Sequence, residues 1–310
     1  MRVTASSFPN VLSAQFQRLS VEQARLQTQA ATGQRFTFAS EDPRAMRKVL
    51  DLQAEMKTLR QFDQNIGALK DTLDASYAAM KGVKKISDRA GEIATLSDGL
   101  RTAEEMGTYG TEVDQLLERS VQLANTRHQS SFLFAGTENR VAPYTVTRDA
   151  NGRITEVTYQ GNAEAAEVEV AEGISLAVAV PGANNTDGGP RALFTDSRSG
   201  ADMFNHLISL RDHLLAGDSA SVRQTDRAAL AADEDNILFH YGNTGAVQTR
   251  LEVAATLAQT RARALEGLVS QESDADLAQT MVSLSEIQNA YTAALKTGGA
   301  ILSQSLLDYI

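Results

Sequence analysis

The chain has 310 residues, enough for a sizeable buried core and more than one module. It contains no cysteine, which excludes disulfide bonds, thiolate metal sites and cysteine nucleophiles. The formal net charge of −10 argues against a nucleic-acid-binding surface, because such surfaces need clustered Lys and Arg. Only five prolines and no tryptophan occur, a composition that favours long helices.

The N-terminal sequence MRVTASSFPNVLSAQF lacks an apolar run of signal-peptide length. No segment of the chain approaches the about 18 apolar residues that a membrane-spanning helix needs. We therefore expect no membrane insertion. The protein is expected to stay in the cytosol or to leave the cell by a route that reads no cleaved signal peptide.

The first expected element is a helix with a heptad pattern. Its seam advances by alternating steps of four and three residues, which is the pattern of a coiled coil. An ordinary amphipathic helix packed on a core remains the alternative interpretation. The seam consists of Leu12, Phe16, Leu19, Gln23, Leu26, Ala30 and Gly33.

The stretch GQRFTFASEDPRA at 33–45 interrupts this helical pattern. A glycine at position 33 can end the helix in a left-handed conformation. The β-branched and aromatic residues of 35–39 predict extended backbone, and either Ser40 or Asp42 is expected to cap the next helix. We predict a short connector that includes Gly33, Phe36, Phe38, Ser40, Asp42 and Pro43.

Two further helices are expected before the pattern changes. Apolar residues spaced by threes and fours run from Leu52 to Val83, and this helix is predicted to end near Gly99. A second apolar stripe, from Met106 to Ala124, predicts another helix and leads to the compact string FLFAG at 132–136.

The period then becomes that of β-strands. In TVTRDANGRITEVTYQGN, alternating residues flank the turn at 149–152, which predicts a hairpin. The β pattern continues at Val168 and Val170 and again over 174–180, where Val178 and Val180 belong to it. These segments predict a small β-rich insert between two helical halves.

Helical periodicity returns at 201–217, continues to Leu268 and ends in a segment that mirrors the first helix. Ordering such terminal segments costs about 1–2 kcal/mol per residue in backbone entropy, and their apolar side chains return only about 1.5–3 kcal/mol each. We therefore expect both terminal segments to be mobile in the monomer and helical in an assembly. The C-terminal seam consists of Leu277, Met281, Leu284, Ile287, Tyr291, Leu295, Gly298, Leu302 and Tyr309.

The expected fold is mainly α: an elongated long-helix coiled coil or bundle with a small inserted β domain. We expect terminal coiled-coil segments at 1–42 and 272–310. A helical body at 43–136 and 195–271 would enclose the β-rich insert at 137–194.

Sequence motifs of catalysis and metal binding are absent. His206 and His213 share a helix face, but seven residues correspond to about 10.5 Å along a helix, too far for one metal ion. No HExxH or CxxC motif occurs, and the insert at 137–194 contains no His or Cys. We interpret the histidines as helix-surface or packing residues and expect no enzyme activity, metal or cofactor.

Several motifs are similar to those of a known family. TGQRFTFASEDPRAM near the N-terminus and NAYTAALKTGGAILSQSLLDYI at the C-terminus resemble the flagellin superfamily. Within it, QSSFLFAGTENRVAPY followed by VTYQGN resembles the flagellar hook–filament junction proteins, also called hook-associated protein 3. The terminal heptads are shared with filament flagellin, whereas FLFAG together with YQGN is more specific.

The resemblance implies a structural role in the bacterial flagellum. It implies unfolded export through the flagellar type III apparatus, with a chaperone, and assembly into a ring that contacts another hook-associated protein and flagellin. The terminal helices would pack along the axis, and the connector would join this axial part to the body. The implied axial residues are Leu12, Phe16, Leu19, Leu26, Leu284, Ile287, Tyr291, Leu295, Ile301, Leu302, Leu306 and Leu307.

Two alternatives stay open at this point. The chain could be flagellin itself, which differs from a junction protein by polymerising on its own. It could also be a stand-alone helical protein that binds a separate coiled-coil partner, in which case a discrete dimer with protease-resistant ends is expected.

Overall fold

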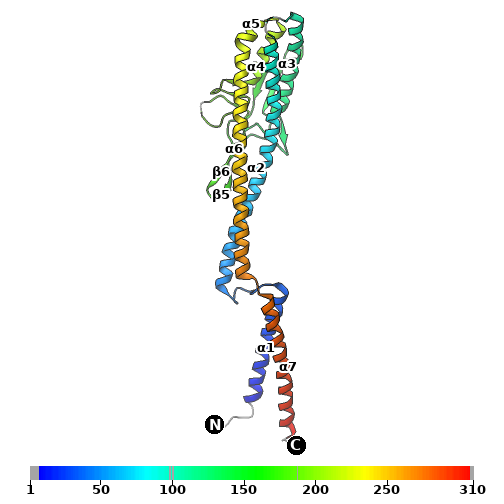
Figure 1. The fold of residues 1–310 in the computed structure, drawn as a ribbon, viewed down its shortest axis with the longest axis vertical. Helices are drawn as coiled ribbons and strands as arrows, with labels where there is room; N and C mark the ends of the chain where they lie inside the picture. The colour runs from blue at the N-terminus through cyan, green and yellow to red at the C-terminus, as the bar shows by residue number, and fades with distance from the viewer. Residues whose placement is uncertain (1–6, 98, 100, 187, 308–310) are drawn as a thin grey trace. The chain divides into compact units, whose positions relative to one another are not determined.

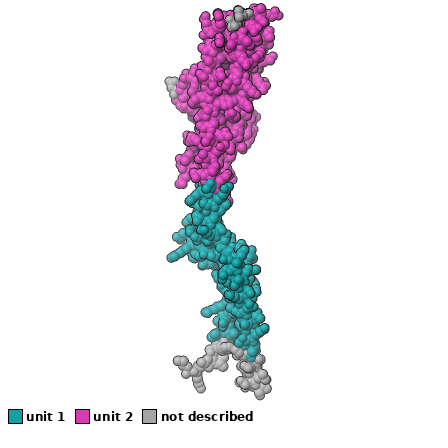
Figure 2. Space-filling view, in the orientation of Figure 1, with its two compact units in different colours: residues 1–59, 260–310 teal, residues 60–259 magenta. Residues whose placement is uncertain are grey.

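The computed structural model describes residues 7–97, 99, 101–186 and 188–307, and it describes side chains within 10–300 of these. The chain divides into two compact units, residues 1–59 with 260–310 and residues 60–259 (Figure 2). The division falls inside two long helices, α2 (Pro43–Leu96) and α6 (Arg227–Ser273). Each unit is therefore built from both halves of the sequence.

The first unit consists of helices. α1 (Ser7–Thr32) and α7 (Leu277–Leu307) lie side by side and run antiparallel (Figure 1). The unit also contains the beginning of α2 and the end of α6. These helices form where breakers are scarce and apolar residues recur at threes and fours, as the sequence predicts.

The second unit combines helices with short strands. α2 ends at Leu96, close to the predicted end, and Gly99 has a φ of +93°. α3 (Ala103–Ala124) begins at a capping box in which the Glu105 amide donates to Thr102 Oγ1 over 3.2 Å and the Thr102 amide donates to Glu105 Oε2 over 2.8 Å. The remaining helical elements are α4 (Met203–Leu215), α5 (Ser219–Ser221), the π-helical turn η1 (Val222–Asp226) and α6.

The strands form small separate sheets. The predicted hairpin is confirmed: β3 (Tyr144–Arg148) and β4 (Ile154–Tyr159) are antiparallel, with Val146 opposite Val157. β5 (Val168–Ala171) pairs with β6 (Ile174–Leu176) in the same sense. The shortest strands are β1 (Arg127–His128) with β2 (Ser131–Phe132), and β7 (Ala183–Asn184), β8 (Thr195–Asp196) and β9 (Ala201–Asp202) in one three-stranded sheet.

One β prediction is wrong. No strand covers 177–182, although Val178 and Val180 were expected to continue the β pattern. Both side chains are buried, but they pack into clusters with residues of the helices. The alternating burial of side chains in this segment therefore comes from contact with helices. It does not come from pairing with another strand.

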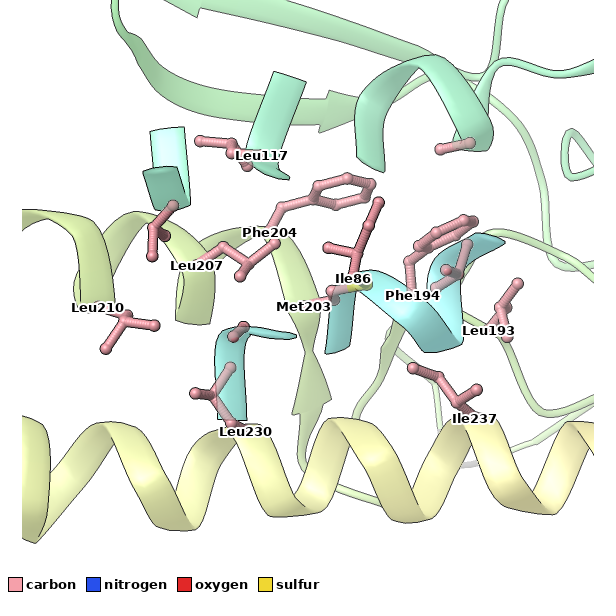
Figure 3. Close-up of a cluster of buried hydrophobic side chains, with 14 of the residues drawn as sticks. Ile86, Leu117, Leu193, Phe194, Met203, Phe204, Leu207, Leu210, Leu230 and Ile237 are labelled. Atoms are coloured by element: carbon pink, nitrogen blue, oxygen red, sulfur yellow. The ribbon is translucent and has the colours of Figure 1, made fainter. Parts of the chain in front are cut away.

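The main core of the second unit lies where α2, α3, α4 and α6 meet (Figure 3). Leu207 and Leu210 of α4, Leu117 of α3 and Ile237 of α6 are almost completely buried there. Each such side chain stabilises the fold by about 1.5–3 kcal/mol relative to an exposed position. An aromatic cluster joins the core to the loops, with ring centroids 4.9–5.5 Å apart, and consists of Phe134, Tyr144, Tyr159, Phe194 and Phe204.

The strings FLFAG and YQGN, far apart in the sequence, are in direct contact. The Asn162 amide donates to the Ala135 carbonyl over 3.2 Å, and the Asn162 side chain accepts from the Thr137 amide over 3.0 Å. The Tyr159 hydroxyl lies 2.9 Å from the carbonyl oxygens of both Phe134 and Asn162. The two motifs are thus two halves of one polar junction between the loops and the aromatic cluster.

Candidate assembly surface

The helices α1 and α7 pack against each other through side chains of both predicted seams. The rings of Phe16 and Tyr291 are edge-to-face, with centroids 5.6 Å apart. Close to the chain ends, Leu12 lies against Gly298, where an added Cβ would stand only 2.9 Å from Leu12 Cδ2. Glycine therefore allows the two helices to approach each other closely at this point.

The predicted axial residues occupy three kinds of position. Leu26 is buried, whereas Leu295 is 51% exposed. The half-buried ones are Leu12, Phe16, Leu19, Leu284, Ile287 and Tyr291. The predictions at Ile301, Leu302, Leu306 and Leu307 lie outside the side chains that the structure describes.

Large apolar side chains also point away from this helix pair. Val21 is 68% exposed, Met281 59%, Val282 54% and Leu277 50%. A helix that is apolar on more than one face normally has more than one neighbour. Val21 and Val282 were not among the axial residues named from the sequence. Both are apolar and lie outside the heptad seams, and this feature of the sequence could have identified them.

The end of α1 is joined to the beginning of α7 by backbone hydrogen bonds. The Arg35 amide donates to the Ser273 carbonyl over 2.6 Å, and the Ala275 amide donates to the Gly33 carbonyl over 2.8 Å. Between these two bonds, Gln34 and Asp274 form an isolated antiparallel bridge. Sequence reasoning missed this pairing because its partners are about 240 residues apart and neither segment has a strand pattern.

The connector contains two phenylalanines with opposite environments. Phe36 is 6% exposed and belongs to a small cluster with Ala45 and Val49 of α2, whereas Phe38 is 65% exposed. Of these two phenylalanines, Phe36 is therefore the one that anchors the connector to the helices. Phe38 is available for contacts outside this chain.

The start of α2 resolves the choice between two predicted caps. Asp42 Oδ1 accepts from the Ala45 amide over 3.0 Å, and α2 begins with Pro43 at its first position. Asp42 also pairs with Arg35 at 3.3 Å. Ser40 lies in the turn before the cap.

The predicted extended backbone over 35–39 is wrong. Only Gln34 makes a bridge, and bends and turns occupy 37–41. The Glu41 amide donates to the Phe38 carbonyl over 3.0 Å, while the Glu41 carboxylate accepts from the Thr37 amide over 2.9 Å. These local hydrogen bonds outweigh the β preference of Phe and Thr.

The histidines take part in packing and in pairs with carboxylates. The part of the chain that the structure describes contains no group of three His, Asp or Glu side chains placed to hold a metal ion. His206 Nδ1 lies 2.8 Å from Asp233 Oδ2, and His213 Nδ1 lies 2.7 Å from Asp226 Oδ2. Sequence reasoning did not anticipate these buried acids.

Within the described residues, no helix combines the length and the hydrophobicity that crossing a membrane requires.

Comparison of the sequence with families and with characterised proteins finds no relative. No family model matches the chain, and no curated protein matches it.

Solved structures, in contrast, resemble it over most of its length. A flagellar hook-associated protein from Vibrio parahaemolyticus superimposes with a TM-score of 0.63 and 19% identity, over 76% of this chain and 100% of that chain. FlgL of Bacillus cereus has a TM-score of 0.56 and 20% identity, over 71% and 99% of the two chains. FlgL of Xanthomonas campestris has a TM-score of 0.57 and 15% identity, over the same shares.

The chain has the fold of these flagellar proteins. The likeness includes long helices with a small β region, as the sequence predicts. The expected fold class is confirmed.

Proposed function

We propose that this chain is a structural subunit of the bacterial flagellum, where it forms the adaptor ring between hook and filament. The observation that carries the proposal is the pair α1–α7, whose facing apolar side chains are mostly only half-buried and which leaves further apolar side chains exposed. The fold shared with hook-associated proteins supports the same role. The FLFAG and YQGN motifs, joined in one junction, favour the junction protein over flagellin.

In this proposal α1 and α7 are the axial assembly elements. Neighbouring copies cover Val21, Leu277, Met281, Val282 and Leu295, which are exposed in the single chain. Residues 33–43 connect the axial helices to the rest of the subunit. The partners are other copies in the ring, a second hook-associated protein, flagellin and an export chaperone.

The proposed location is the extracellular flagellum, reached through the flagellar type III apparatus. Marginal packing of α1 and α7 supports this route, because a subunit with incompletely buried ends unfolds easily at those ends before export.

The test measures whether the Met281→Asp variant is incorporated into flagella. This side chain is 59% exposed, so the variant is expected to fold as well as the wild type. A buried carboxylate in an apolar assembly contact is strongly unfavourable, so swimming and incorporation should be lost in cells that depend on this gene. The matched control is Gln279→Asp, an exposed polar position two residues away. Normal incorporation of Met281→Asp would contradict the axial role.

A seeded assembly assay separates the remaining alternatives. Purified protein is mixed with sheared flagellar filaments and inspected by electron microscopy. Short additions or no growth support the junction protein, whereas long filaments of this chain would identify a flagellin. A discrete soluble dimer that ignores the seeds would favour a stand-alone coiled-coil protein.

A further inference from the structure

Two His–Asp pairs lie between α4 and the segment formed by η1 and α6. His206 and His213 come from α4, Asp226 ends η1, and Asp233 lies in α6. The carboxylates are 1–2% exposed, while the imidazoles are 22% and 31% exposed. Water therefore reaches the histidines but not the acids, and His206 is the route by which a proton enters or leaves the His206–Asp233 pair.

Both acids have fixed hydrogen-bond partners in addition to histidine. Asp233 Oδ1 accepts from the Asp202 amide over 2.9 Å. Asp226 Oδ1 accepts from the Ser209 hydroxyl of α4 over 2.8 Å. These contacts hold each carboxylate in place, and within the described part of the chain the titratable side chain that hydrogen-bonds to each acid is its histidine.

We propose that the His206–Asp233 pair forms a proton-dependent latch, which holds α4 against α6 and opens as the pH rises above neutrality. Histidine changes charge near neutral pH, so a protonated imidazole balances the buried carboxylate on the acidic side. After deprotonation of His206, the buried negative charge of Asp233 remains without a counter-charge, which is strongly unfavourable.

The surrounding charges act in the same direction. His206 faces Asp233 of α6, Asp202 of β9 and Asp226 of η1. His213 faces Asp226 and Asp218, the residue before α5. The cation on α4, Arg211, is engaged with Asp114 of α3 at 3.1 Å and with Asp212. Protonated His206 therefore supplies the positive charge at Asp233.

The pKa shifts have the sign that the latch requires. Burial alone would lower the pKa of His206, but the hydrogen bond and charge of Asp233 raise it above its ordinary value. Burial raises the pKa of Asp233, against the opposing effect of His206. Both shifts favour the proton-bound folded state. The stabilisation is complete below the ordinary histidine pKa of about 6.5 and is lost as the pH rises through the higher folded value.

The test is amide hydrogen exchange of the full chain at pH 6 and pH 9, corrected for the intrinsic exchange chemistry. Amides of 203–226 are expected to lose protection at pH 9, because the folded pKa of His206 is raised above its ordinary value and the stabilisation is lost as the pH rises through it. Amides of α3 should keep theirs. Unchanged protection of 203–226, or an equal loss in α3, would overturn the latch.

Variants separate charge from packing. Asp233→Asn removes the buried charge with little change in size, so protection at pH 9 should be retained to a greater degree than in the wild type. His206→Gln should resemble the alkaline wild type already at pH 6. The matched control, Asp235→Asn, changes an exposed acid on the same helix and should leave the pH response unchanged. An Asp233→Asn variant that opens like the wild type would contradict the proposal.

If Asp233→Asn fails to fold, titration of the wild-type imidazole signals by NMR replaces it. His206 should titrate above the pKa of free histidine. A value at or below that of free histidine would overturn the latch.

Discussion

Gly136 is the residue at which FLFAG turns towards YQGN. It has a φ of +68°, and an added Cβ would stand 2.2 Å from the carbonyl oxygen of Asn162. The left-handed conformation and the close approach both require glycine here. Gly152, in the turn between β3 and β4, also has a positive φ of +82° but has no atom near the position of a Cβ.

These two glycines give a matched pair of substitutions. Gly152→Ala should destabilise the second unit by about 1 kcal/mol, from backbone strain alone. Gly136→Ala should cost about 2 kcal/mol more, because the new methyl group overlaps backbone that cannot move freely. Urea unfolding followed by circular dichroism measures both. Equal losses of unfolding free energy in the two variants would mean that the FLFAG–YQGN contact accommodates the added methyl group without a loss of stability.

At this scale the sequence is an incomplete guide. It shows that FLFAG and YQGN occur together, but their contact depends on how β4 and the loops pack, which no local pattern encodes. The acids opposite His206 and His213 are unpredictable for the same reason. Their burial follows from the position of α4 on α6, and acidic residues on helices are usually exposed.

Among the elements, the connector at 33–43 shows how one side chain can fix a segment. Phe36 is the aromatic member of its small cluster. The amides that join α1 to α7 are close to it: Arg35 is its neighbour in sequence, and Ala275 lies across the bridge. Removing the ring of a buried Phe costs about 3–5 kcal/mol in a well-packed core.

Phe36→Ala is therefore expected to weaken the connector by up to about 3 kcal/mol, since the cluster is small. The readout is faster hydrogen exchange of the Arg35 and Ala275 amides. Phe38→Ala changes the same residue type at an exposed position and should leave both amides as protected as before. Equal exchange in the two variants would show that Phe36 is not the anchor.

Element types were predictable where a period was long and uninterrupted, as in α1, α2, α3, α4 and the β3–β4 hairpin. The failures lie where a specific hydrogen bond or tertiary contact outweighs local propensity. Residues 37–41 form turns because of the Glu41 hydrogen bonds, and the valines at 178 and 180 are buried by helices without joining a strand. Local propensity is outweighed by hydrogen bonding in the first case and by packing in the second.

For the whole molecule, the two units differ in how completely they bury their apolar side chains. In the second unit many core residues are fully buried, including Phe134, Phe194 and Leu207. The α1–α7 pair contributes mainly half-buried residues such as Phe16 and Tyr291. Ion pairs such as Arg261–Glu55 in the first unit are exposed and add little stability.

We therefore expect the first unit to open before the second in the isolated chain. Amides of α1 and α7 should exchange at least about a hundredfold faster than those of α3, because local opening there exposes little apolar surface. Hydrogen exchange with mass spectrometry on the dilute monomer measures both regions at once. Equal protection of α1 and α3 would refute the expectation that the terminal helices become ordered only in an assembly.

The bridge between Gln34 and Asp274 has a mechanical consequence. The Arg35–Ser273 and Ala275–Gly33 hydrogen bonds cross two antiparallel backbones, so a pull on α1 alone loads both bonds in shear at the same moment. Bonds loaded together resist more force than bonds broken in sequence. Unequal tension on the two terminal helices is thus transmitted from one backbone to the other at this point, and the two hydrogen bonds share the force.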